Sequence, residues 1–146
     1  MTYAELQVTS NFSFLRGASH PQELVYAASA LGLAAVALTD RNSLAGIVRA
    51  HTTAKETGVR FVVGCRLHLA DGNSNLDGGL GLLCWPTDRA AYGRLCRLLT
   101  LGQRRAPKGG CVIGWEDVIG HAEGQILAAI PPDQPDAAFA GWGVCG

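Results

Sequence analysis

Short apolar runs alternate with longer segments of helical periodicity along the chain, and glycine-rich or polar stretches separate them. The apolar runs predict strands at residues 6–8, 34–38, 61–63, 80–85 and 125–130. The periodic segments predict helices from Pro21 to Gly32, from Asn42 to Gly58, from Thr87 or Asp88 to the basic Arg104 and Arg105, and from Trp115 to His121. Strands that alternate with helices build parallel sheets with covering helices, so the pattern indicates an α/β fold.

Local signals set the expected helix boundaries. Ser19 and Gln22 are spaced as a capping box around Pro21, a residue that favours the first helical position. Asn42 is a good N-cap for the second predicted helix. Helical spacing places one apolar face of the first helix at Leu24, Ala27, Ala28 and Leu31. Residues 71–79 are rich in glycine, asparagine and aspartate and predict a turn region.

Composition places the chain among globular proteins of one domain. It has 146 residues, of which 48% are hydrophobic and only 16% charged, so it has enough apolar material for a buried core. Basic and acidic residues number 12 each. The chain therefore lacks the basic excess that an isolated domain usually needs to bind a phosphate backbone.

The cysteines and the N-terminus bear on the cellular compartment. The five cysteines lie far apart and form no CxxC pair, which argues against a disulfide framework and a zinc ribbon. We expect reduced, mostly buried thiols at Cys65, Cys84, Cys96, Cys111 and Cys145. No signal peptide is evident, and no apolar run approaches the roughly 20 residues of a membrane span. These features predict a cytoplasmic protein.

Four sequence blocks carry a family resemblance. They are SNFSFLRGASHPQEL at 10–24, ALTDRNSLAGIVRAH at 37–51, VVGCRL at 62–67 and LLCWPTDRAAYGRLCRLLTLG at 82–102. Together they resemble the start of the PHP (polymerase and histidinol phosphatase) domain of bacterial DNA polymerase III alpha subunits. The first block looks specifically like the error-prone members of that family, which act in translesion synthesis. The resemblance is collinear over nearly the whole chain.

The resemblance implies a distorted β/α barrel followed by palm, thumb and fingers domains. Residues 1–146 would then be the N-terminal part of a PHP-type domain, truncated before the barrel closes. The polymerase aspartates and the Mg²⁺ they use would lie in domains absent from this chain, so no cofactor is expected here. The implied partners are the remainder of the polymerase chain and, through the full-length parent, DNA and other translesion-synthesis proteins.

An unclosed barrel has consequences for stability. After Pro135 the last strand-and-helix unit looks cut off, which would leave an open sheet edge. We expect the isolated chain to be aggregation-prone or marginally stable. We also expect an ordered core limited to the first three strands and the helices that begin near Pro21 and Asn42.

The resemblance also implies where the metal ligands of a PHP domain fall. Metal-binding members use His, Asp and Glu at strand ends to hold divalent ions that activate water. Matched motif by motif, these positions correspond here to Gln7, Thr9, Arg16, Arg41, Arg66 and Gly81. Arginine is always charged and offers no lone pair, so the three arginines oppose a bound cation. We predict a degenerate site with no metal and no catalytic residue.

The arginines at this site leave two interpretations open. Arg16, Arg41 and Arg66 could pair internally with Asp40 and Glu5, or they could bind an anion such as phosphate. Asp40 itself is expected to be structural, capping or bracing the loop before the second predicted helix.

The histidines and the arginines of the third predicted helix are weaker candidates for functional residues. No histidine pair has a metal-binding spacing, which favours structural or surface roles over ligand roles for His20, His51, His68 and His121. The zero net charge favours a solvated basic helix end over nucleic-acid contacts for Arg94, Arg97, Arg104 and Arg105.

Three functions remain in competition. The leading one is a non-catalytic scaffold that supports the polymerase module of an error-prone enzyme. The second is a metal-dependent phosphoesterase or 3′–5′ exonuclease of the PHP family, which the missing ligands disfavour. The third is a free-standing interaction module. If the first function is correct, the parent chain is a DNA-directed DNA polymerase. This chain alone is expected to be inactive.

Overall fold

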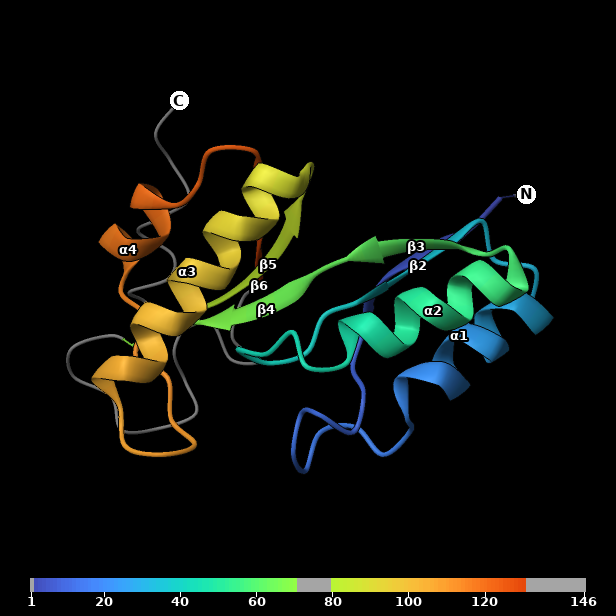
Figure 1. Ribbon diagram of the computed structural model, residues 1–146, viewed down its shortest axis with the longest axis horizontal. Coiled ribbons are helices and arrows are strands. Elements are labelled where there is room, and N and C mark those ends of the chain that lie inside the picture. Colours follow the sequence, from blue (N-terminus) through green and yellow to red (C-terminus); the bar gives the residue numbers. More distant parts are fainter. Residues whose placement is uncertain (1, 71–79, 131–146) are drawn as a thin grey trace.

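The computed structural model describes residues 2–70 and 80–130, which form two lobes joined by one extended segment (Figure 1). In chain order the elements are β1 (Ala4–Val8), α1 (Pro21–Ala30), β2 (Ala35–Leu38), α2 (Ile47–Thr57), β3 (Arg60–Val63), β4 (Cys65–His68), β5 (Gly81–Pro86), α3 (Arg89–Arg105), α4 (Trp115–Gly120) and β6 (Gln125–Ile130). Every predicted strand and helix has a counterpart here, and the mixed α/β class is confirmed. The described strands form two three-stranded sheets and no closed barrel.

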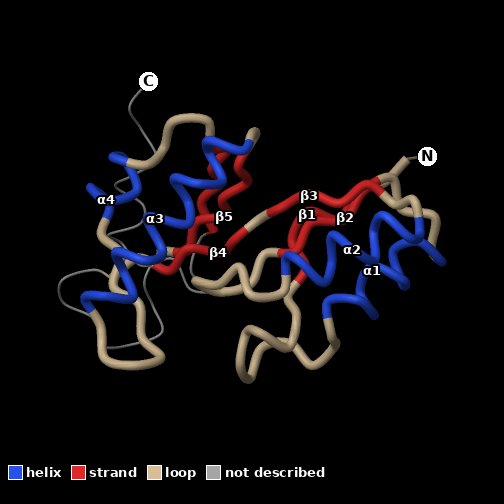
Figure 2. Tube along the Cα trace, viewed as in Figure 1, coloured by secondary structure: helices blue, strands red, loops and turns tan. Residues whose placement is uncertain are grey.

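The first lobe is a parallel sheet with two helices on one face. Its strand order is β1-β2-β3, and all four residues of the central β2 are buried. Figure 2 shows α1 and α2 lying together along this sheet. The helices and β2 share one core, formed by Val25, Ala28, Val36, Leu38, Ile47, Ala50 and Ala54. The alternate residues Ala35 and Ala37 are also buried, so β2 is covered on both faces, as predicted.

The second lobe departs from the predicted parallel arrangement. β4, β5 and β6 form an antiparallel sheet in this order, with Cys65 opposite Cys84. Thr87, just after β5, donates to the Gly124 carbonyl from its backbone N–H at 2.9 Å and from its hydroxyl at 2.7 Å. The start of β6 is thus held beside the end of β5, so the two strands run in opposite directions. The expectation of a wholly parallel sheet is wrong for this half.

A second hydrophobic core lies between this antiparallel sheet, α3 and α4. Its buried members are Cys65, Leu67, Leu69, Leu82, Cys84, Leu95, Leu98, Leu99, Ile113 and Val118. The expectation that the ordered core would be limited to the first three strands and two helices is therefore wrong. The apolar face of α3 covers the second sheet and contributes Leu95, Leu98 and Leu99 to this core.

Gly64 connects the two sheets. The chain passes from β3 through Gly64 directly into β4, so one segment crosses both lobes (Figure 1). A Cβ at this position would lie 2.7 Å from Thr39 Cγ2 and 2.9 Å from Trp85 Cδ1. The Trp85 indole N–H also donates to the Leu6 carbonyl at 3.2 Å, which ties β1 to β5. The junction therefore requires a residue without a side chain.

The capping box of α1 lies one residue later in the sequence than predicted. Pro21 is the first helical residue, as expected, but the N-cap is His20. The His20 N–H donates to the Glu23 carboxylate at 2.8 Å, so Glu23 replaces Gln22 as the acceptor. The buried face of α1 also differs from the prediction, because Ala27 and Leu31 are exposed and Val25 is buried.

The start of α2 is the largest boundary error. The helix begins at Ile47, and its N-cap is Gly46 rather than Asn42. Asn42 has a positive φ of 48°, and its side-chain oxygen accepts a hydrogen bond from the His68 N–H at 3.0 Å. A tertiary contact with β4 thus occupies the side chain that would have capped the helix. For α3 the local signal holds, since the cap is one of the two residues predicted for it, Asp88.

Some predictions fall on residues outside the described part. These are the turn region at 71–79, the segment after Pro135 and Cys145. The four described cysteines are free thiols, two of them buried. Among the described helices, none is long and apolar enough to span a membrane.

Candidate functional site

The carboxylate of Asp40 organises the end of the parallel sheet. Asp40 follows β2 closely and is only 2% exposed. Its two oxygens accept hydrogen bonds from the Ser10 N–H at 2.7 Å, the Ser10 hydroxyl at 2.6 Å and the Ser13 hydroxyl at 2.8 Å. Such bonds compensate a carboxylate for the loss of water on burial. Asp40 therefore braces the loop before α1, whereas the sequence placed this bracing before the second helix.

The loop at residues 9–20 is folded tightly around this carboxylate. The Ser13 N–H donates to the Ser10 carbonyl, and the Arg16 and Gly17 N–H groups both donate to the Ser13 carbonyl. A Cβ at Gly17 would lie 2.3 Å from the Ser10 carbonyl oxygen, so this position requires glycine. At the loop tip Leu15 has a φ of 62°, which branched side chains rarely adopt. The spacing of serines and glycine in the first sequence block thus matches one hydrogen-bonded turn.

Arg41 and Arg66 lie side by side where the two sheets meet. They form a parallel β-bridge, in which the Asn42 N–H donates to the Arg66 carbonyl and the Arg66 N–H to the Asp40 carbonyl, both at 2.9 Å. Paired residues on neighbouring strands project to the same face of a sheet. The Arg66 side chain passes over Gly81, where a Cβ would lie 3.5 Å from its Nε and 3.6 Å from its Nη2. Three of the six mapped ligand positions therefore adjoin one another.

The other mapped positions lie on β1 or in the loop after it. The Val8 carbonyl accepts from the Thr39 N–H at 2.7 Å, which places the adjacent Thr9 at the end of β1 beside the end of β2. Gln7 is exposed on β1, and Arg16 is exposed in the loop. The structure thus brings Thr9 to the same strand ends as the arginine pair and leaves Gln7 and Arg16 facing solvent. The correspondence of these positions with metal ligands stays a prediction.

The acidic partners expected for these arginines are engaged elsewhere. The Asp40 carboxylate is held by serines, and the Glu5 carboxylate accepts from the Tyr3 hydroxyl at 2.7 Å. The two interpretations left open for these arginines, internal pairing and anion binding, stay predictions.

Two arginines of α3 do form ion pairs. Arg94 lies 3.4 Å from the Glu123 carboxylate, and Arg105 lies 2.6 Å from that of Asp117. The hydrogen bond from Arg105 is the main reason that the pKa of Asp117 is lowered from its usual value. The remaining α3 arginines, at positions 89, 97 and 104, are exposed. This arrangement is that of a solvated basic helix end.

Histidines and cysteines do not gather into a metal-binding group in the described part of the chain. The His121 ring nitrogen Nδ1 lies 2.7 Å from the Asp117 carbonyl, and the His51 ring packs 6.5 Å from the Phe61 ring. Burial raises the pKa of Cys65 to about 12 and that of Cys84 to about 12. Both thiols are therefore neutral at physiological pH, and neutral thiols are poor nucleophiles and poor metal ligands.

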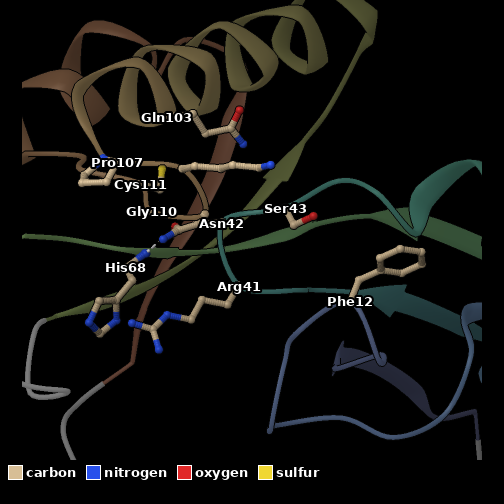
Figure 3. Close-up of a pocket in the computed structure, with 11 residues that line it drawn as sticks. Phe12, Arg41, Asn42, Ser43, His68, Gln103, Pro107, Gly110 and Cys111 are labelled. Carbon is tan, nitrogen blue, oxygen red and sulfur yellow. Dashed lines mark hydrogen bonds between the residues drawn. The ribbon is translucent and has the colours of Figure 1, made fainter.

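A pocket of about 710 Å³ opens beside the arginine pair, between the segment after β2 and the loop after α3 (Figure 3). Its polar lining comprises Arg41, Asn42, Ser43, His68, Gln103 and Lys108. In Figure 3 the Arg41 side chain extends toward the His68 ring, and Gln103 projects from α3 toward the segment of Asn42 and Ser43. Sequence reasoning singled out Arg41 alone of this set as a candidate site residue. No local signal shows that the loop at 106–110 lies against residues 41–43.

Comparison with known proteins finds one matching domain family and several similar proteins that share a name. The PHP domain family matches residues 5–138. Error-prone DNA polymerases of Caulobacter vibrioides and Agrobacterium fabrum are 56% identical to this chain over 94% and 96% of its length. An error-prone DNA polymerase of Rhodopirellula baltica is 46% identical over 92%. The chain spans only about 12% of the length of the first two relatives.

Two solved structures share the fold. An amidohydrolase from Chromobacterium violaceum, solved with bound sulfate and no metal, has a TM-score of 0.57 and 24% identity. The alignment covers 70% of this chain and 34% of that protein. A protein from Bifidobacterium adolescentis assigned as a metal-dependent phosphoesterase has a TM-score of 0.56 and 19% identity, with 84% and 44% coverage. At these identities the likeness shows the fold alone.

The family match and the fold agree. The matched range contains both sheets, the Asp40 loop and the arginine pair. The structural neighbours reproduce the mixed α/β arrangement. This chain belongs to the PHP domain family.

Proposed function

We propose that this chain is the N-terminal part of the PHP domain of an error-prone DNA polymerase of the DNA polymerase III alpha type. The support is 56% identity to error-prone polymerases over nearly the whole chain, combined with the small share of those proteins that it spans. In this proposal the parent acts in damage-induced translesion synthesis in the cytoplasm. Palm, thumb and fingers domains with their Mg²⁺, the grip on DNA and the recruitment of other translesion proteins belong to the remainder of the polymerase.

The proposed role of the domain itself is that of a non-catalytic scaffold. The observation that carries this role is the pairing of Arg41 with Arg66, whose side chain lies over Gly81. A cation at these strand ends would meet two permanent positive charges and no lone pair from either guanidinium. Asp40, the nearby carboxylate, already accepts three hydrogen bonds from serines. The site is therefore suited to holding strands together and not to activating water.

The second candidate function is a metal-dependent phosphoesterase or exonuclease. It is favoured by the Bifidobacterium neighbour, which shares the fold and is assigned that activity. A phosphodiesterase assay with bis(p-nitrophenyl) phosphate and added Mn²⁺ or Zn²⁺ separates the two candidates. The scaffold proposal expects no nitrophenol release above the buffer rate. A metal-dependent rate that disappears in Asp40→Asn would replace the scaffold with the second candidate.

The proposed parentage has a separate test. The genomic DNA that follows the coding region, read in all frames, should continue into the rest of the PHP domain and then into palm-domain sequence. An unrelated gene and a termination region at that place would instead favour a free-standing interaction module.

A further inference from the structure

The pocket between the segment after β2 and the loop after α3 has the chemistry of an anion site. We propose that it binds a phosphate group, carried either by a free phosphate compound or by a nucleic-acid strand. This inference goes beyond the scaffold role and does not depend on it, because five of the six polar lining residues lie outside the mapped metal positions. Only Arg41 belongs to both sets.

Charge is the first argument. Two lining residues, Arg41 and Lys108, are cations, and no Asp or Glu is among the described residues that line the pocket. The whole chain has a formal net charge of zero. Both cationic side chains therefore line one concave surface, and concave surfaces focus field lines.

Hydrogen-bond donors are the second argument. The Asn42 oxygen is engaged by the His68 N–H, which leaves the amide NH₂ as the group that can donate. The Ser43 oxygen accepts from the Ala45 N–H at 3.2 Å, so its hydroxyl hydrogen remains able to donate. Gln103, exposed on α3, supplies a second amide. Neutral donors beside two cations are the combination that phosphate oxygens accept.

The shape of the pocket is the third argument. The loop that closes one side turns at Gly109, which has a φ of 88°, and the Gly110 N–H donates to the Pro107 carbonyl at 2.9 Å. The two adjacent glycines add no side chain to this wall, so a ligand can approach their backbone closely. At the opposite end Phe12 contributes an aromatic ring (Figure 3). The volume of about 710 Å³ is larger than a phosphate ion requires and admits an attached organic group.

The test is titration calorimetry on the 146-residue chain with three probes. These are inorganic phosphate, pyrophosphate and a short 5′-phosphorylated oligothymidylate. We expect saturable binding at one site for at least one probe, weakened by added salt. Lys108→Gln should lower the affinity about tenfold, since a charge-assisted hydrogen bond is lost. Gln103→Ala should weaken it to a smaller extent.

The chain offers a matched control. Lys55 is the only other lysine, and it is exposed on α2, outside the pocket lining. Lys55→Gln removes the same charge and should leave the affinity unchanged. Tighter binding of the oligonucleotide than of pyrophosphate would identify a nucleic-acid strand as the source, and the reverse order a free phosphate compound. Absence of saturable binding by all three probes, or equal losses in Lys108→Gln and Lys55→Gln, would overturn the proposal.

Discussion

Asp40 holds in place a loop that lies far from it in the sequence. The carboxylate is nearly inaccessible, yet its bonds all go to serines some 30 residues earlier in the chain. Those bonds hold the turn at residues 10–17 and align the ends of β1 and β2. A structural role could be anticipated from the residue type, but the partners could not, because they depend on the pairing of the two strands.

We predict that Asp40→Asn destabilises the protein by about 1–3 kcal/mol, because charge-assisted bonds from buried serines are replaced by weaker neutral ones. Equilibrium denaturation in urea measures the change. Asp88→Asn is the matched control, since asparagine caps a helix as well as aspartate does. Equal stability of the two variants would show that the Asp40 network contributes little.

The six positions mapped to metal ligands illustrate the limits of residue-level prediction. Reading the motifs placed arginine at three mapped ligand positions, and the structure puts Arg41, Arg66 and Gly81 together. The passage of Arg66 over Gly81 could not be anticipated, because it depends on β5 lying antiparallel to β4. The neutral donors of the two carboxylates, serines for Asp40 and Tyr3 for Glu5, could not be anticipated from the motifs either.

Helix α3 packs against the second sheet, and its glycines offer a direct test of this packing. Its two glycines have opposite surroundings. A Cβ at Gly102 would lie 2.6 Å from both Cys111 Sγ and Ile113 Cγ1, whereas a Cβ at Gly93 would have no neighbour within 4 Å. The same helix therefore contains one glycine needed for close packing and one that packing does not require.

We predict opposite effects for the same substitution at these two positions. Gly102→Ala should destabilise the protein by about 1–3 kcal/mol through overpacking. Gly93→Ala should stabilise it by up to about 1 kcal/mol, because alanine loses less backbone entropy in a helix. Thermal or urea unfolding of both variants measures the difference. Stabilisation by Gly102→Ala would mean that the loop after α3 does not pack against the helix as described.

Elements were predicted well where local signals act alone. The Asp88 cap, the end of α2 at Gly58 and the buried β2 follow from residue type and periodicity. The start of α2 and the direction of β6 could not be predicted from residue type and periodicity. Asn42 bonds to β4, and Thr87 holds the start of β6, and neither contact is visible in a short sequence window.

At the scale of the molecule, the described residues form two cores and two sheets, with exposed apolar residues on strands β1 and β6. Among the described strands, β1 pairs only with β2 and β6 only with β5. Leu6 on β1 is 42% exposed, and Ile126 on β6 is 57% exposed. Such strands are templates for association with a second chain.

We predict that the isolated chain associates in solution despite its second core. Light scattering during thermal unfolding should show aggregates before or with the transition. Leu6→Lys and Ile126→Lys should reduce the scattering, since lysine on an edge strand opposes pairing. Val48→Lys, at an apolar position on α2 that is 71% exposed, is the control. A sharp cooperative transition from a soluble monomer would refute this expectation.

The proposed phosphate pocket is the feature that could least be predicted from the sequence. Its walls come from residues 41–43 and 103–111, which meet only because α3 returns along the second sheet. The glycines and the lysine at 108 indicated no more than a loop, and zero net charge argued against binding of a phosphate backbone by the isolated domain. Local concentration of charge is a property of the folded surface and not of the composition.

The metal content of the purified protein tests the central claim, a PHP domain without metal chemistry, most directly. The protein is incubated with Zn²⁺ or Mn²⁺, dialysed against metal-free buffer and analysed by mass spectrometry of the retained metal. The arginine pair predicts that no stoichiometric metal remains. One or more equivalents of tightly held zinc, lost when His20 or His68 is mutated, would contradict the account.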